Sequence, residues 1–282
     1  MEKQIFTIGY TIPTFDKSHV DFYGEQSLMD ADILLVSPDS LEPRGNWVSF
    51  TTSDGGCYNV ETSRVYKQKI THLKKEIEDF LNAGKTVFIL LTKKEEISLA
   101  HGVSTEKKGQ NMYSTGIHSN YDILPIGIGT LTSASGKYIE FSGNPLLSDF
   151  YDKFKKNLEY QLYIENPNGA KVIFTGKDKT KILGAIFKVK SGHLVVLPYI
   201  KYEEKKFTEY KGKGKEKKEY WTKEAIQFGK SLVKTFADID KALRKGGDRT
   251  PPPDWTSEAD FQLVQEQVLK IVEELRSQNI TD

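Results

Sequence analysis

Residues 30–41, DADILLVSPDSL, decide the fold that we expect for this chain. Their segment 32–37, DILLVS, lacks polar alternation, which is typical of a strand buried on both faces. A second apolar segment, KTVFILLT at 85–92, directly follows a helical pattern over 63–83 that ends at Gly84. Glycine there favours a helix C-cap, so a helix leads into a buried strand. We therefore expect an α/β fold with a doubly wound, mostly parallel sheet and a helical C-terminal extension.

The composition indicates a globular protein and excludes several other classes. Hydrophobic residues make up 38% and charged residues 28% of the 282 positions, and the formal net charge is +1. No apolar run reaches the roughly 18–20 residues of a membrane span, and the N-terminus lacks the pattern of a secretory signal. These features predict a cytoplasmic protein with no global attraction to nucleic acid or membrane.

Cysteine and histidine spacing gives no sign of a metal site or cofactor. Cys57 is the one cysteine, which excludes an internal disulfide and a CxxC zinc motif and agrees with a reducing compartment. His72 has no second histidine three or four residues away on its helix. We therefore expect neither metal nor cofactor.

The chain divides into five parts by pattern. A polar stretch at 93–120 interrupts the α/β pattern and is expected to be an insertion or flexible loop. Three consecutive strands follow later, ending in HLVVLPYI at 193–200. The expected parts are an α/β domain at 1–200, a lysine-rich loop at 201–219, an amphipathic helix at 220–247, a proline-rich linker at 248–256 and a heptad-patterned helix at 257–282.

The order of these elements resembles the class I glutamine-amidotransferase-like domains, which are flavodoxin-like. The resemblance rests on an early strand, the DILLVS strand, the helix leading into VFILLT, and a late hairpin closing as SGHLVVLPYI. Residues 220–255 are also similar to a segment of uncharacterised bacterial proteins, in which an amidotransferase-like region and a helical linker precede a restriction-endonuclease-like domain. The second resemblance implies that this chain is the front half of such a protein, with a nuclease domain as its partner.

The catalytic pattern of that family is missing. An active member needs a cysteine at a G-x-C-x-G strand-to-helix turn, with a histidine and an acid to activate it. Cys57 lies in TSDGGCYNV without a glycine two positions on, and His193 lacks a glutamate two positions on. His101 and His118 lie in the polar stretch. We expect no catalytic triad, and these four residues are the candidates should catalysis survive.

Polar residues follow the buried strands where open α/β proteins keep their ligand sites. Ser37 and Asp39 follow the first strand, and Thr92 and Glu95 follow the second, so these four are candidate ligand-binding residues. A proline-directed turn is the competing interpretation of 37–40. The segment 127–136, GIGTLTSASG, has the composition of a phosphate cradle but matches neither G-x-G-x-x-G nor the P-loop.

Two C-terminal segments suggest interactions. Residues 201–218 are rich in lysine, and Lys211, Lys213 and Lys215 are candidate nucleic-acid contacts, although a solvated loop is favoured. The last helix carries a heptad seam, which predicts a coiled-coil homodimer or packing back onto the same chain. The seam consists of Phe261, Val264, Val268, Ile271 and Leu275.

These observations favour a non-catalytic sensing or assembly module that binds a ligand or partner and acts through its C-terminal helices. Two alternatives stay open. One is a thiol-dependent hydrolase or amidase that uses Cys57, and the other is a nucleic-acid-binding module that uses the lysines of 201–218.

Overall fold

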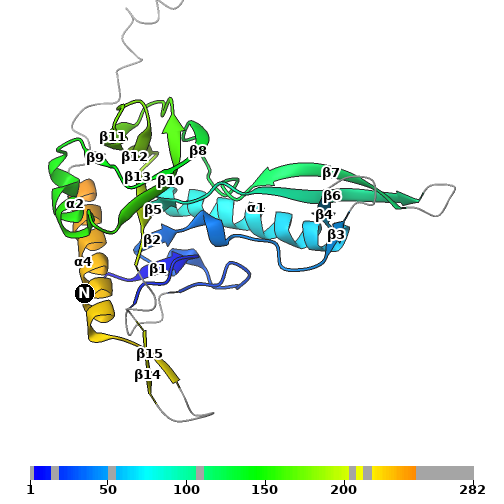
Figure 1. Ribbon diagram of the computed structural model, residues 1–282, viewed down its shortest axis with the longest axis horizontal. Coiled ribbons are helices and arrows are strands. Elements are labelled where there is room, and N and C mark those ends of the chain that lie inside the picture. The colour runs from blue at the N-terminus through cyan, green and yellow to red at the C-terminus, as the bar shows by residue number, and fades with distance from the viewer. Residues whose placement is uncertain are drawn as a thin grey trace, which may run out of the picture. The chain divides into compact units, whose positions relative to one another are not determined.

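A computed structural model describes residues 3–13, 19–49, 55–105, 111–202, 208–211 and 218–245 (Figure 1). The chain divides into two units, Met1–Leu243 and Arg244–Asp282, and every described strand belongs to the first. Within the described residues, no helix combines the length and apolar character that crossing a membrane requires.

Four neighbouring strands form the parallel part of the main sheet. They are β1 (Ile5–Ile8), β2 (Ile33–Val36), β5 (Thr86–Leu91) and β13 (Gly192–Ile200), and each is parallel to its neighbours in this order. The segments DILLVS and KTVFILLT therefore form adjacent central strands, as their apolar character predicts.

The rest of the nine-stranded sheet is antiparallel. The hairpin of β12 (Ile182–Val189) and β13 turns at Lys190, which has a φ of 50°. Beside it lie β10 (Leu158–Glu165), β11 (Lys171–Thr175), β9 (Glu140–Phe141) and β8 (Thr130–Gly136), all joined by antiparallel pairings.

The expectation of a doubly wound, mostly parallel sheet of amidotransferase-like topology is therefore wrong. The sheet is mixed, because the chain after Ser119 returns in antiparallel strands rather than through crossover helices. Burial on both faces misled the prediction: β12 is almost wholly buried although all its partners are antiparallel. Such burial requires cover on both faces of a sheet and carries no information about strand direction.

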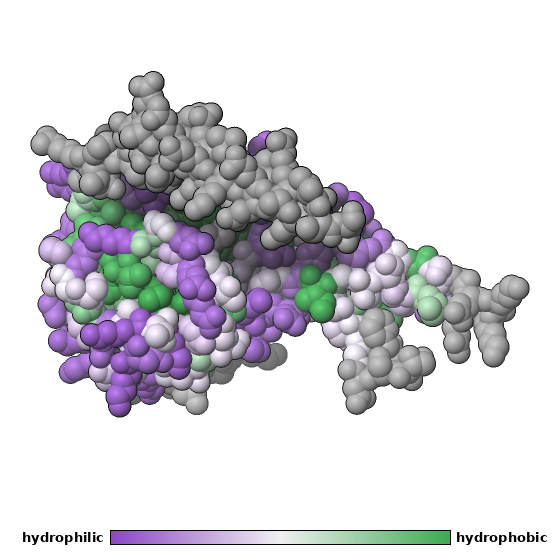
Figure 2. All heavy atoms as spheres, turned by 90° about the horizontal axis from the view of Figure 1, so that it is seen from above, coloured by the Kyte–Doolittle hydropathy of each residue, from purple (hydrophilic) through white to green (hydrophobic). Residues whose placement is uncertain are grey.

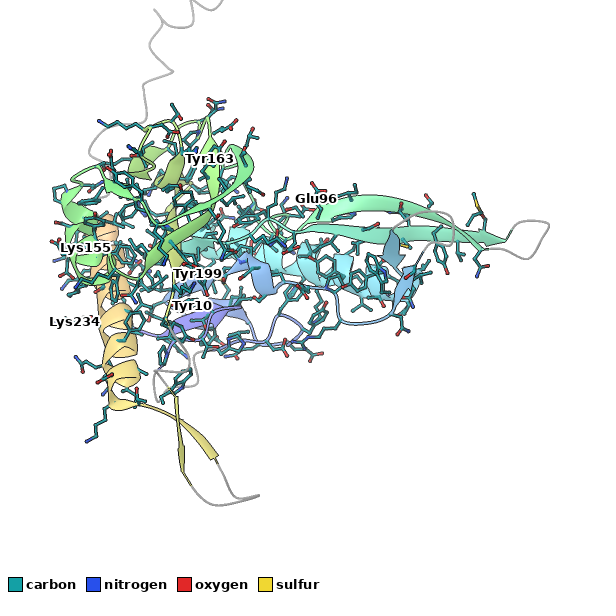
Figure 3. All side chains as sticks on the ribbon, in the orientation of Figure 1. Tyr10, Glu96, Lys155, Tyr163, Tyr199 and Lys234 are labelled. Atoms are coloured by element: carbon teal, nitrogen blue, oxygen red, sulfur yellow. The ribbon has the colours of Figure 1, made fainter. Side chains whose placement is uncertain are left out.

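Three helices provide that cover. On one face, α1 (Val60–Asn82) packs its apolar stripe against strand residues that include Leu34 and Val36. On the other, α2 (Ser148–Phe154) and α4 (Lys223–Lys245) pack against residues that include Ile33 and Leu35. Successive residues of β2 thus enter opposite cores, as the period of two in a strand requires. Lys234 lies on the exposed side of α4 (Figure 3).

Local signals set the ends of α1. The Asn59 side chain accepts a hydrogen bond from the Thr62 N–H at 2.8 Å and caps the N-terminus. At the other end Gly84 has a φ of 74°, the left-handed conformation that a C-cap glycine supplies. The predicted C-terminal boundary of this helix is confirmed, and its start lies slightly earlier than predicted.

The stretch expected to be an insertion or a flexible loop contains two long strands, so the flexible loop is wrong. β6 (Glu96–Thr105) and β7 (Asn111–Ser119) pair antiparallel and complete a sheet in the order β3-β4-β6-β7, with β3 (Trp47–Ser49) and β4 (Gly56–Tyr58). Figure 1 shows the β6–β7 pair lying along α1 and extending beyond the helix; we call this pair the arm. Only Ile97, Leu99 and Ala100 of the described β6 side chains are buried. Three buried residues make too short an apolar pattern to predict a strand of this length.

An ion pair with a buried carboxylate attaches α4 to the amino ends of the parallel strands. Asp240 is fully buried and pairs with the Lys3 ammonium, and the Thr86 hydroxyl donates a hydrogen bond of 2.6 Å to the same carboxylate. A further small hairpin consists of β14 (Thr208–Lys211) and β15 (Lys218–Trp221).

Candidate functional site

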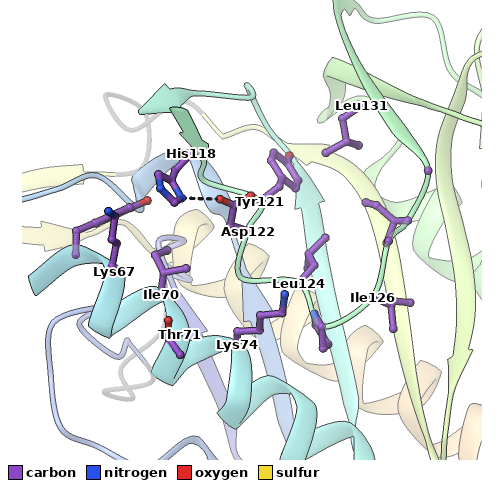
Figure 4. A pocket seen from close by; sticks show the side chains of 15 residues that line it. Lys67, Ile70, Thr71, Lys74, His118, Tyr121, Asp122, Leu124, Ile126 and Leu131 are labelled. Atoms are coloured by element: carbon purple, nitrogen blue, oxygen red, sulfur yellow. Dashed lines mark ion pairs between the residues drawn. The ribbon is translucent and has the colours of Figure 1, made fainter. Parts of the chain in front are cut away.

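A pocket of about 800 Å³ lies between α1 and the segment 118–131 (Figure 4). This volume is in the range of small-molecule binding sites. Its walls are mainly apolar, and both α1 and the segment 118–131 contribute charged or ionisable groups to them. The lining residues are Tyr66, Lys67, Ile70, Thr71, Lys74, His118, Tyr121, Asp122, Leu124, Pro125, Ile126, Gly127, Ile128, Gly129 and Leu131.

Helical spacing places the first wall. Ile70 and Thr71 lie three and four positions after Lys67 and four and three positions before Lys74, so the four residues share one stripe of α1. Tyr66, beside this stripe, is buried and donates a hydrogen bond of 2.9 Å to the Leu41 carbonyl. This hydrogen bond fixes the Tyr66 phenol, so this wall of the pocket is already formed in the absence of a ligand.

Hydrogen bonds to the end of β5 fix the second wall. The Tyr121 hydroxyl accepts from the Thr92 N–H at 3.0 Å and donates to the Thr92 carbonyl at 2.8 Å. Asn120 accepts from the Glu95 N–H and donates to the Lys93 carbonyl, each at 3.0 Å. Two adjacent side chains therefore attach the pocket loop to the carboxyl end of the main sheet.

Gly129 brings the last part of this wall close to β10. Its φ is 111°, and a Cβ there would lie 2.5 Å from the Glu165 carbonyl oxygen. Gly127, two residues earlier, has no heavy atom within 4 Å of the corresponding position. Only one of these two glycines is therefore required by the backbone.

Two histidines meet at the edge of the pocket. The rings of His101 and His118 lie 5.9 Å apart, and His118 Nδ1 is 3.4 Å from Asp122 Oδ2. The register of β6 against β7 shifts between Ala100 and Gly102, so His101 is the additional residue of a β-bulge. Its ring fits over Gly116, where a Cβ would lie 2.1 Å from Nε2.

Lys67 completes this polar cluster. Its Nζ is 2.7 Å from His101 Nδ1. A lysine ammonium can only donate, so with Lys67 charged, His101 accepts at Nδ1 and carries its proton on Nε2. Partial burial lowers the pKa of the Lys67 ammonium. Within the described part of the chain, neither Lys67 nor Lys74 pairs with a carboxylate.

The two tyrosine hydroxyl groups of the pocket are poor nucleophiles. Burial is the main cause that raises the pKa of both Tyr66 and Tyr121 well above the ordinary range, so both phenols stay protonated near neutral pH. The lining contains no serine or cysteine. The arrangement can bind an anion and shield an apolar group, and the His118–Asp122 pair can exchange a proton with a bound molecule.

The residues predicted to bind a ligand at the sheet edge bond chiefly to protein groups. The Ser37 hydroxyl donates to Asp39 Oδ1 at 2.6 Å, and the Asp39 N–H donates to the Thr92 hydroxyl at 3.1 Å. Glu95 pairs with Lys93 at 2.7 Å. The structure brings Ser37, Asp39 and Thr92 together, and through Thr92 they are linked to Tyr121 and the pocket.

Cys57 lies away from any catalytic arrangement that the described hydrogen bonds reveal. It is fully buried in β4, opposite Val48, and burial raises the pKa of its thiol. In the described residues no hydrogen bond joins this thiol to a histidine. Of the other candidates, His193 of β13 lies opposite Thr86 of β5 in the strand register, at the amino ends of the parallel strands. His101 and His118 lie close together at the pocket.

Several predicted contacts fall elsewhere. Lys211 ends β14, whereas Lys213 and Lys215 lie outside the described residues. The same is true of the linker 248–256 and the heptad seam Phe261, Val264, Val268, Ile271 and Leu275. No group of three or more histidine, cysteine or carboxylate side chains in the described ranges is arranged to hold a metal ion.

Sequence reasoning named His118 and the glycines of 127–136 but missed Lys67 and Lys74. The available signal was two lysines seven residues apart beside an apolar helical stripe. Comparison of the sequence with protein-family models and with curated proteins finds no match.

Proposed function

We propose that this chain is a sensing module of the cytoplasm, and that it binds a small anion with an apolar or aromatic part in the pocket between α1 and 118–131. The observation that carries the proposal is the pair Lys67 and Lys74 on the wall of a preformed, mainly apolar pocket, without carboxylate partners in the described residues. A ligand anion would supply the missing negative charge.

The spacing of the two lysines defines the ligand further. Seven residues of helix correspond to a rise of about 10 Å, so one compact anionic group contacts one lysine and leaves the apolar part to Ile70 and Leu124. A ligand with two anionic groups at that separation would contact both lysines.

Thiol-dependent hydrolysis, the alternative, has less support. The Cys57 thiol is buried, its pKa is raised, and it is not among the residues that line the pocket. A nucleophilic cysteine needs a lowered pKa and access to its substrate.

Two fluorescent probes test the proposal. 8-Anilinonaphthalene-1-sulfonate carries a sulfonate, and N-phenyl-1-naphthylamine is the same ring system without it. We expect the sulfonate to bind the wild-type chain at least tenfold more tightly. In the double variant Lys67→Gln/Lys74→Gln this preference should disappear, because each charge-assisted hydrogen bond is worth about 1.5–3 kcal/mol.

The matched control is Lys75→Gln/Lys234→Gln, which removes the same charge from exposed positions of α1 and α4 outside the pocket. It should retain the preference for the sulfonate. Equal loss in both double variants would mean that the probe responds only to net charge, and equal binding of the two probes to the wild type would contradict an anion site.

A further inference from the structure

The outer edge of the arm is open to strand pairing between Met112 and His118, since the Ser119 N–H beyond them donates to Asp122 Oδ2. In the order β3-β4-β6-β7, β7 is the last strand, and β6 is its partner along all nine of its residues. No other described strand pairs with β7. A row of backbone N–H and C=O groups on an edge strand is a template for another strand.

The usual protection of an edge strand is missing from β7. Its sequence, NMYSTGIHS, contains no lysine, arginine, aspartate, glutamate or proline. The bulge of the arm is centred on His101 of β6, so the additional residue lies on the inner strand. Charged residues, proline and bulges are the features by which natural proteins prevent edge-to-edge pairing.

Exposed apolar side chains accompany this edge. Gly116 and His118 pair with the buried residues Leu99 and Ile97, so their face of the arm is directed towards the core that α1 covers. Tyr113, Thr115 and Ile117 alternate with them and share the opposite face. Ile117 is 73% exposed. Figure 2 shows hydrophobic spheres along this projecting part of the molecule.

We propose that β7 pairs antiparallel with β7 of a second copy of this chain, about a two-fold axis at Thr115. Among antiparallel self-pairings, this register is the one that pairs all seven residues from Met112 to His118. It places Tyr113 opposite Ile117 twice, and aromatic with β-branched residues are favourable cross-strand pairs. A second copy fits the edge because neutral β7 then meets an equally neutral strand, with no like charges opposed.

The dimer continues the sheet β3-β4-β6-β7 into an eight-stranded sheet across the axis. Met112 of one copy stands opposite His118 of the other, and His118 lines the pocket. The second copy therefore passes the mouth of the pocket. This surface is distinct from the heptad seam predicted at the C-terminus.

A charge exchange at the axis tests the register. In the full chain, Thr115→Lys and Thr115→Glu each place like charges directly opposite each other, so we expect each variant to dissociate at least tenfold more readily than the wild-type dimer. An equimolar mixture should form a heterodimer, because lysine then faces glutamate. Sedimentation velocity measures all three samples at about 1–50 micromolar. This range detects a dimer whose Kd is on the order of tens of micromolar.

Val103→Lys is the control, since it adds the same charge at an exposed position of β6 away from the edge, and should remain dimeric. Circular dichroism checks that each variant is folded. A wild-type chain that is still monomeric at about 50 micromolar would refute the dimer, because any Kd would then be weaker than roughly that concentration. Variants that stay dimeric would place the interface elsewhere, and a mixture that fails to associate would refute the register.

Discussion

At the scale of single residues, the two pocket glycines have opposite requirements. Gly129 adopts a φ of 111° and leaves no room for a Cβ, whereas Gly127 has open space at the same point. We expect Gly129→Ala to reduce the free energy of unfolding by about 1–3 kcal/mol, because the residue would be held in a disfavoured conformation against β10.

Gly127→Ala is the matched control and should change the free energy of unfolding by less than about 0.5 kcal/mol. Urea denaturation of both variants and the wild type measures the difference. Similar losses at the two positions would mean that the segment 127–129 does not have the backbone conformation described above.

Cys57 gives a prediction that depends on pH. Burial raises the pKa of the thiol in the folded state above the value of about 8.5 that an exposed cysteine has. A raised pKa stabilises the fold fully below the unfolded pKa, and this contribution is lost as the pH rises through the folded pKa. The pH window to test is about 8 to 10, around and above the ordinary thiol pKa. Across it, the free energy of unfolding should fall more for the wild type than for Cys57→Ala.

The comparison with Cys57→Ala is needed because buried tyrosines, including Tyr66 and Tyr121, also have raised pKa values, so their deprotonation in alkali lowers the stability of the fold as well. A second measurement uses the fact that Cys57 is the one cysteine of the chain. Its reaction with a disulfide reagent such as 5,5′-dithiobis(2-nitrobenzoate) should be slow in the native protein and fast in urea. Rapid native reaction would restore the hydrolase as a serious alternative.

At the scale of elements, one tyrosine joins the pocket loop to the main sheet. Tyr121→Phe removes both hydrogen bonds between its hydroxyl and the backbone of Thr92, which is fully buried. The backbone groups left without this partner should cost about 1–3 kcal/mol of stability. The affinity for the sulfonate probe should fall as well, because the second wall of the pocket loses its attachment.

Tyr138→Phe provides the comparison for this variant. The Tyr138 hydroxyl donates to Glu140 at 2.8 Å, but the residue is 54% exposed, so water can replace the bond. Its stability should stay within about 0.5 kcal/mol of the wild type. Calorimetry and probe titration distinguish the two tyrosines, and an unchanged Tyr121→Phe variant would remove the proposed link between pocket and sheet.

The elements differ in how well their sequence predicted them. The 63–83 helix was predictable because its apolar residues recur at helical spacing and Gly84 ends it. The arm was not, because a strand pair with one partly covered face needs few apolar residues. The pocket combines α1 with a segment about 50 residues later, and no local pattern indicates such a pairing.

At the scale of the whole Met1–Leu243 unit, the apolar strands predicted the layers but not their order. Residues such as Ile33 and Leu34 require cover on opposite faces, and α4 and α1 supply it. Strand direction depends on connections, which hydrophobic patterns do not encode. The contact of Lys3 with Asp240, 237 positions away, could not be foreseen from either residue's neighbours.

The place of β13 beside β5 has a consequence for the chain while it is being made. β5 ends at Leu91, and β13 begins only at Gly192. At the usual pace of synthesis, the roughly 100 residues between them take about 5–20 s to emerge. During that interval the strand TVFILL has β2 on one side and lacks its later neighbour on the other. The nascent chain thus carries an apolar strand with one edge uncovered, and we expect it to be most prone to aggregation during this interval.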